Sequence, residues 1–181
     1  MRADARENLD RILAAAARLF AQDGADTSLK AIALEADVGI ATLYRRFPTR
    51  RDLIAEVFAG QMTEYVELAE RALREPDPWK AFVGYLFRLF ELQAADRGLS
   101  ELLASTGFDD DERLSELRAA DQRGASEVIA RAQRAGALRA DFSRRDLALL
   151  MRANAGVVRA SLEPDSWKRQ LELLLTGLAS R

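Results

Sequence analysis

Apolar residues recur at intervals of three and four positions along nearly the whole chain, which is the spacing of one buried helix face. No segment of useful length shows the strict alternation of a strand, and the sequence contains no internal repeat. The periodic segments predict an all-α protein of about nine helices, which cover roughly residues 6–22, 28–36, 40–47, 49–74, 79–95, 99–105, 109–135, 143–162 and 165–178.

The stretch 28–47 has the pattern of two short helices joined by a tight turn. Its first helix has one apolar face, made of Leu29, Ile32, Ala33 and Ala36. Ser28 precedes this face and is placed to cap the helix through its hydroxyl. The sequence Asp37-Val38-Gly39 then breaks the pattern, and we expect Gly39 to supply a positive φ there. This arrangement is typical of a helix-turn-helix.

The second short helix runs from Ile40 to Phe47 and ends before Pro48, whose ring disfavours helical geometry in the residue before it. Leu43 and Phe47 are four positions apart and can face inward. The outward positions combine small, aromatic and basic side chains, namely Ala41, Thr42, Tyr44, Arg45 and Arg46. With the first helix of the chain, these two helices predict a three-helix bundle around Leu13, Phe20, Ile32, Leu43 and Phe47.

Positive charge is concentrated around this second helix. The segment 38–51 contains four arginines and no acid, although the whole chain has a net charge of −2. A local basic patch on an acidic protein indicates an attraction for a polyanion such as DNA. The alternative is that these arginines form only the solvated face of a surface helix.

The first fifty residues resemble the tetracycline-repressor (TetR) family of bacterial transcription regulators. The resemblance depends on Ala16 and Phe20, Gly24, the pair Ile32-Ala33, the motif Leu43-Tyr44-x-x-Phe47, and Arg50. Two positions depart from the family pattern, because Asp37 stands where the family usually has glycine and Gly39 stands where it usually has a capping serine.

The resemblance implies roles for individual residues. Thr42, Arg45 and Arg46 are expected to contact bases or backbone in the major groove, where an arginine can pair with guanine, and the outward-facing Ala41 belongs to the same DNA-binding set. Tyr44 and Arg50 are expected to bind phosphates, and Ser28 and Lys30 complete the predicted DNA-binding set at the start of the helix that precedes the turn.

The sequence predicts two domains, with residues 1–52 binding DNA and residues 53–181 forming a helical regulatory domain. The last two helices carry apolar stripes that look wider than one neighbour needs, and family members use these helices to form dimers. We therefore expect a dimer interface of Leu147, Val158, Trp167, Leu171, Leu174 and Leu178. The alternative is that both stripes pack within one subunit.

The resemblance also implies a small-molecule pocket in the second domain. Its expected lining residues are Met62, Tyr65, Phe82, Tyr85, Leu86, Phe90, Phe108, Met151 and Asn154. Asn154 is the best single candidate, because a buried amide needs polar partners that a ligand can provide. An aromatic stripe at helical spacing can equally be plain core.

Composition excludes several classes of function. The chain has no cysteine and no histidine, which removes disulfides, thiol nucleophiles, imidazole bases and the preferred ligands of zinc. The dense acidic run 109–112 lacks the spacing of a calcium loop, and we assign it to the start of a helix, where acids complement the helix dipole. We expect no metal, no cofactor and no enzymatic activity.

No apolar run approaches the roughly 20 residues needed to cross a bilayer, and no secretory signal opens the chain. A cytoplasmic protein without a membrane partner is therefore expected. The main hypothesis is a homodimeric repressor that binds a palindromic operator in double-stranded DNA and is released by an unidentified small-molecule effector. The alternative hypothesis is an all-α ligand-carrier or protein-interaction module without DNA binding.

Overall fold

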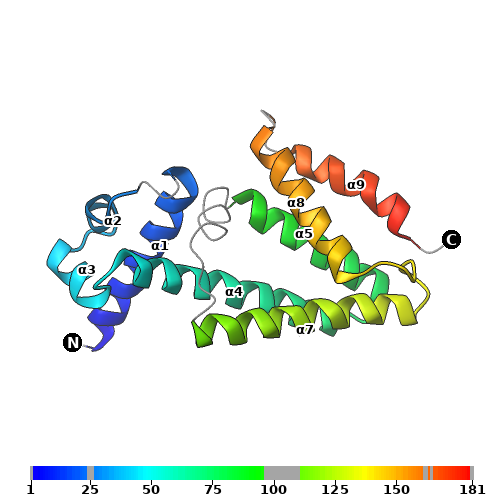
Figure 1. The fold of residues 1–181 in the computed structure, drawn as a ribbon, viewed down its shortest axis with the longest axis horizontal. Coiled ribbons are helices and arrows are strands. Elements are labelled where there is room, and N and C mark those ends of the chain that lie inside the picture. The colour runs from blue at the N-terminus through cyan, green and yellow to red at the C-terminus, as the bar shows by residue number, and fades with distance from the viewer. Residues whose placement is uncertain (1, 24–26, 96–110, 161–162, 164, 180–181) are drawn as a thin grey trace. The chain divides into compact units, whose positions relative to one another are not determined.

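The structure, a computed structural model, describes residues 2–23, 27–95, 111–160, 163 and 165–179; within them the chain forms helices joined by turns and loops, with one isolated β-bridge between Leu138 and Ala179 and no strand. This confirms the all-α prediction. The expected short helix at 99–105 lies outside the described residues. The helices within them are α1 (Arg2–Asp23), α2 (Leu29–Glu35), α3 (Ile40–Arg46), α4 (Arg50–Arg74), α5 (Pro78–Ala95), α7 (Glu112–Arg134), α8 (Arg144–Ala160) and α9 (Ser166–Leu178) (Figure 1).

Side-chain caps fix the beginnings of several helices. At α4, the backbone N–H of Thr49 donates to Asp52 Oδ2 (2.9 Å), and the N–H of Asp52 donates to Thr49 Oγ1 (3.2 Å). Ser143 and Asp146 form the same reciprocal pair at α8, and the hydrogen bonds from Ser143 lower the pKa of the Asp146 carboxyl. Both pairs are capping boxes, with aspartate in place of the usual glutamate.

The acidic run before α7 also has the role that its sequence predicts, as far as the structure describes it. Asp111 Oδ1 accepts a hydrogen bond from the backbone N–H of Leu114 (3.1 Å) in the first turn of α7. Asp109 and Asp110 lie outside the described residues. The Asp111 carboxylate satisfies one of the free N–H groups at the helix start.

The chain divides into two compact units, and the division falls inside α4 and α7. The first unit contains Met1–Gln61 and Asp96–Leu114, and the second contains Met62–Ala95 and Ser115–Arg181. The predicted functional boundary at residues 52 and 53 lies on α4, nine residues before the end of the first continuous segment of unit one.

The first unit is built around a core from α1, α2, α3 and the N-terminal part of α4. Its fully covered side chains include Ile12, Phe20, Ile32, Leu43 and Leu53. Leu13 was predicted to be in this core but is only partly buried, because the neighbouring Ile12 points more directly inward. Arg113, in the first turn of α7, joins α4 through two hydrogen bonds to the carboxylate of Glu56 (2.7 and 3.3 Å).

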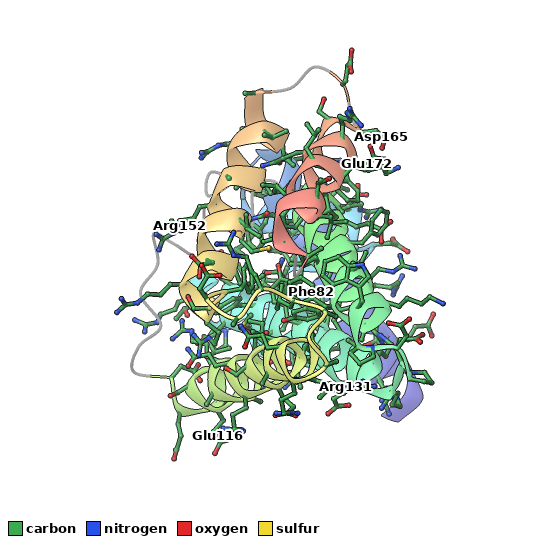
Figure 2. All side chains as sticks on the ribbon, turned by 90° about the vertical axis from the view of Figure 1, so that its right-hand side faces the viewer. Phe82, Glu116, Arg131, Arg152, Asp165 and Glu172 are labelled. Atoms are coloured by element: carbon green, nitrogen blue, oxygen red, sulfur yellow. The ribbon has the colours of Figure 1, made fainter. Side chains whose placement is uncertain are left out.

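The second unit has a core to which α5 contributes most. This helix packs against α8 and α9, which also contact each other. Phe82 is completely buried and lies among the helices, whereas Glu116 and Arg152 point away from them (Figure 2). The hydrophobic stripes of α5, α7, α8 and α9 therefore cover one another within this unit.

Two contacts hold α7 against α4 in the second unit. A Cβ atom at Gly124 would lie only 2.6 Å from Ala69 Cβ, so glycine allows the two helices to approach closely at this crossing. Further along, Arg131 donates from Nη1 to the carbonyl oxygen of Leu73 and from Nη2 to that of Pro76, both at 2.9 Å. Arg131 thus satisfies carbonyl groups at and after the C-terminus of α4.

Candidate functional sites

The helix-turn-helix begins with a well-capped α2. Ser28 Oγ accepts a hydrogen bond from the backbone N–H of Ala31 (3.1 Å), which confirms its predicted capping role. Ile32 and Ala33 are buried, whereas Lys30, two positions before Ile32, is exposed. The first turn of α2 therefore presents Ser28 and Lys30 at the surface, while the opposite face is fixed in the core.

The turn after α2 differs from its predicted geometry. Asp37 has the positive φ (51°), whereas Gly39 has a φ of −64°, so the expected positive φ at Gly39 was wrong. Gly39 does serve as the N-cap of α3, the position where the family usually has a capping serine. The Asp37 N–H donates to the carbonyl of Leu34 (3.1 Å) and the Val38 N–H to that of Ala33 (3.0 Å). These two bonds form a Schellman motif, which requires the left-handed conformation one residue after the C-cap Ala36.

Helix α3 separates a buried face from a basic, exposed face. Leu43 and Phe47 are buried, as predicted, and hold α3 on the first unit. Tyr44 is 51% exposed, and the other side chains of the outer face, Ala41, Arg45 and Arg46, are exposed as well. Arg45 Nη2 donates to Thr42 Oγ1 (3.4 Å), so these two predicted contact residues lie together one helical turn apart.

The four arginines of the basic segment do not share one environment. Arg45, Arg46 and Arg51 are exposed, whereas Arg50 is only partly exposed. Arg50 Nη1 donates to the backbone carbonyl of Thr27, and its guanidinium carbon lies 5.4 Å from the centroid of the Phe20 ring. The basic surface of α3 is thus formed by Arg45 and Arg46, while Arg50 is engaged with its own protein.

The predicted pocket residues lie in the interior of the second unit. Phe82, Tyr85, Leu86 and Phe90 are buried in its hydrophobic cluster, against which Tyr65 and Met151 pack with partial exposure. Met62 is also buried, and Phe108 lies outside the described residues. The structure thus brings most of these residues together, whether as a ligand site or as a plain core.

Asn154 has an unbalanced set of polar contacts in this interior. Its side chain is fully covered (0% exposed), and Nδ2 donates to Gln93 Oε1 (2.8 Å) and to the carbonyl oxygen of Phe90 (3.5 Å). Its Oδ1 atom has no hydrogen-bond partner among the described residues. A buried acceptor without a partner costs stability, and a donor group placed beside this oxygen would remove that cost.

Asp121 is a further polar group of the interior that the sequence analysis missed. Burial raises the pKa of its carboxyl, and the positive charge of Arg144 acts in the opposite direction. Burial also raises the pKa of the Tyr85 hydroxyl, an effect that the nearby Asp121 strengthens. The position of Asp121 could have been found from its spacing, because it falls on the apolar face of α7 between Leu114 and Ala125.

A groove of ≈ 690 Å³ runs over α4 and α5 in the second unit. Its lining combines both signs of charge, with an ion pair between Arg71 and Glu67 on α4 and another between Arg88 and Glu91 on α5. Tyr85 is the one predicted pocket residue in this lining. Sequence periodicity did not reveal the groove, because it depends on the distance between two helices.

The residues predicted to join two subunits are largely interior. Leu147, Val158, Trp167, Leu171 and Leu178 are buried within their own subunit, and Leu174 is partly buried. The outer faces of α8 and α9 instead carry Leu149 (58% exposed) and Leu173 (61% exposed). The dimer contact itself stays a prediction, and among the described residues of α8 and α9 these two leucines are the exposed large apolar side chains.

The described residues were compared with the requirements of a membrane-spanning helix and of a metal site. No helix within them combines the length and apolarity that crossing a membrane requires. In the same residues, no group of three or more carboxylates gathers closely enough to hold a metal ion.

Two family models match complementary parts of the chain. The model described as "Bacterial regulatory proteins, tetR family" matches residues 12–57, which include α2 and α3. The model described as "Transcriptional regulator SbtR-like, C-terminal domain" matches residues 77–180.

Solved structures of transcription regulators resemble the whole chain. A TetR regulatory protein from Mycobacterium vanbaalenii is 30% identical, with 98% of each chain covered and a TM-score of 0.73. A TetR regulator from Streptomyces coelicolor is 31% identical, with 94% of this chain and 98% of that chain covered and a TM-score of 0.68. A curated HTH-type regulator from Staphylococcus aureus is 44% identical over 67 residues, which span 36% of this chain and 36% of that relative.

Proposed function

Because the chain belongs to the TetR family of bacterial transcription regulators, we propose that it is a homodimeric repressor that binds a palindromic operator and leaves it when a small-molecule effector binds. The observation that carries this proposal is α3, whose buried side fixes it to the first unit while Arg45 and Arg46 face outward. An exposed, basic second helix of a helix-turn-helix can enter the major groove.

We assign distinct roles to the side chains of this surface. Arg45 and Arg46 are long enough to pair with guanine, and Ala41 and Thr42 are small enough to allow α3 to approach the base edges. Tyr44, Ser28 and Lys30 flank the groove-facing side chains and contact phosphates, which position the protein without reading sequence. Arg50 was also assigned to phosphate binding from the sequence, but its guanidinium contacts the Thr27 carbonyl and the Phe20 ring.

Two subunits are needed to read a palindrome. Equivalent α3 helices must lie about one helical turn of DNA, roughly 34 Å, apart to enter successive major grooves. We propose that α8 and α9 of two subunits pair through their outer faces, with Leu149 and Leu173 near the centre of the contact. Their exposure on adjacent helices supports this assignment, because large apolar side chains at a surface gain stability when a partner covers them.

We propose that the interior of the second unit holds the effector. Residues 53–181 would then form the regulatory domain and residues 1–52 the DNA-binding domain, both acting in the bacterial cytoplasm where the operator is found. The aromatic and aliphatic side chains around Phe82 and Phe90 suit an apolar body, and the Asn154 Oδ1 atom, which has no partner within the described part of the chain, suits a hydroxyl or amide donor. Binding there would displace α4 and change the distance between the two α3 helices.

The test is a footprinting experiment with the purified full-length protein on the DNA directly upstream of its own coding region. We expect a protected palindrome whose affinity falls steeply between 50 and 200 mM salt, because binding releases counterions from the phosphates. Protection elsewhere in a genomic selection would retain the regulator function but remove autoregulation. If no duplex were protected, the chain would instead be a ligand-carrier or interaction protein.

A further inference from the structure

We infer that Arg50 is a positioning residue, which locks the orientation of the DNA-reading helix α3 from inside the protein, and that phosphate binding is not its main role. The inference rests on the proposed operator binding. The Arg50 side chain extends from α4 and contacts two other parts of the first unit, Phe20 on α1 and Thr27 before α2.

Arg50 starts from a fixed backbone. It is the first residue of α4, next to the reciprocal hydrogen bonds between Thr49 and Asp52 that cap this helix. The capping box fixes the backbone at the start of the helix from which the Arg50 side chain extends. Its side chain is partly buried, in contrast to the exposed Arg51 beside it.

The guanidinium reaches the residue that precedes the cap of α2. Arg50 Nη1 donates to the carbonyl oxygen of Thr27, which is itself 5% exposed. Thr27 Oγ1 in turn donates to the carbonyl oxygen of Leu19 on α1 (3.1 Å). The positive charge of the donor strengthens the first of these bonds, so the start of α2 is tied to both α4 and α1.

The same guanidinium also contacts the core directly. Its central carbon lies 5.4 Å from the ring centroid of Phe20, a fully buried residue of α1, which is within the range of a cation–π interaction. A guanidinium is planar, and it can stack on a ring while its N–H groups point at an acceptor in its own plane. Lysine cannot combine these two contacts in the same way.

The position of these contacts in the chain explains their importance for α3. This helix has seven residues and is connected to α2 by the turn at 36–39 and to α4 by residues 47–49. Its orientation therefore depends on how firmly α2 and α4 are held together. Arg50 joins α4, which follows α3, to the start of α2 and to α1, which precede it, so a single side chain holds together the helices on both sides of α3 in the sequence.

The two possible roles of Arg50 predict different binding behaviour. A phosphate contact affects all DNA sequences alike and contributes about 0.9 to the salt slope for each subunit, or about 1.8 for a dimer. A positioning residue contributes to operator binding only, because non-specific DNA does not require a single orientation of α3. Its removal leaves the salt slope unchanged.

The experiment compares wild type with Arg50→Ala, Arg50→Lys and Arg51→Ala, using full-length protein. Affinity is measured by fluorescence anisotropy for the operator and for an unrelated duplex between 50 and 250 mM salt, and circular dichroism verifies that each variant is folded. Arg51→Ala removes the same charge from the neighbouring residue, so it measures the general electrostatic effect at this end of α4.

We expect Arg50→Ala to weaken operator binding by about tenfold or more, the factor for one lost charged hydrogen bond. Binding to the unrelated duplex should change less than about twofold, with the salt slope equal to that of Arg51→Ala. Arg50→Lys should restore only part of the operator affinity, because the ammonium keeps the charge without the planar contacts.

Equal losses on both duplexes, a salt slope lowered by about 1.8 relative to Arg51→Ala, or full rescue by lysine would overturn the inference and identify a phosphate anchor. Unchanged operator affinity in a folded Arg50→Ala protein would overturn it as well. A failure of the proposed function would look different. Wild type itself would then show no salt-dependent binding to any duplex, and both proposals would be wrong.

Discussion

At the scale of single residues, the turn of the helix-turn-helix shows how a local departure from the family pattern is accommodated. Asp37 occupies the left-handed position that closes α2, the same position that Gly136 occupies after α7 with a φ of 66°. Aspartate is among the few non-glycine residues that tolerate this conformation. Arg11 also forms an ion pair with the Asp37 carboxylate (3.3 Å). Both side chains are exposed, so this pair adds little to the stability of the turn.

Substitution of Asp37 tests this explanation. We expect Asp37→Ala to be less stable than Asp37→Gly by about 1 kcal/mol, because alanine has a Cβ that disfavours positive φ. Both variants lose the Arg11 ion pair, so their difference isolates the backbone effect. The measurement is the free energy of unfolding in urea, and equal values for the two variants would contradict the assigned conformation.

At the scale of elements, the pairing of α4 with α7 determines how closely the second unit packs. The close contact with Ala69 explains why glycine stands at position 124 in the middle of α7. In helix propensity alone, glycine costs about 1 kcal/mol relative to alanine there. Arg131 adds two hydrogen bonds to carbonyl groups at the end of α4. The two helices are therefore held together where Gly124 packs on Ala69 and where Arg131 donates its two hydrogen bonds.

A methyl group at the crossing should force the helices apart. Gly124→Ala is expected to lower the free energy of unfolding by about 1 to 2 kcal/mol, because overpacking outweighs the gain in helix propensity. The matched control is Gly84→Ala on α5, where nothing lies within 4 Å of the added Cβ, and which should be neutral or stabilising. Thermal or urea unfolding measures both.

The double variant Gly124→Ala with Ala69→Gly provides the decisive comparison. Removal of the Ala69 methyl group vacates the space that the new Cβ requires. The substitution at Gly124 should then cost much less than it does beside Ala69. An identical cost in both backgrounds would indicate that the 2.6 Å approach is not what excludes alanine.

At the scale of the whole molecule, exposed apolar side chains indicate where a TetR-family regulator meets its partners. Among the described residues, the exposed large hydrophobic side chains fall in two regions, with Leu34, Ile40 and Tyr44 in the helix-turn-helix and Leu149 and Leu173 on α8 and α9. The first region is the proposed DNA-binding surface. The second is the proposed surface for another subunit.

Charge placed on the second region should separate the subunits. We expect the double variant Leu149→Arg and Leu173→Arg to sediment as a monomer and to bind its operator at least about 100-fold more weakly, because one subunit reads only a half-site. Each exposed leucine contributes little to the fold of its own subunit, so circular dichroism should show the same helical content as in wild type.

Arg123→Ala, an exposed substitution on α7, is the control for a general effect of altered surface charge. It should leave both the sedimentation coefficient and the operator affinity close to those of wild type. A double leucine variant that remained dimeric would place the subunit contact elsewhere on the molecule.

Several features of this protein were determined by short stretches of its sequence. The helices, the capping pairs Thr49–Asp52 and Ser143–Asp146, and the exposed arginines of α3 followed from periodicity and from hydrogen bonds between residues three positions apart. Such features are local, because the groups that make them are held close together by the chain itself.

Only the tertiary structure decided which partner each side chain meets. Periodicity identified the apolar stripes of α8 and α9, but Leu147 faces the interior and Leu149 the surface because the neighbouring helices cover one side of α8. In the same way, Arg50 meets Thr27, 23 positions earlier in the chain, and Gly124 meets Ala69 on another helix. Distances between residues so far apart depend on the packing of whole helices, which no local pattern contains.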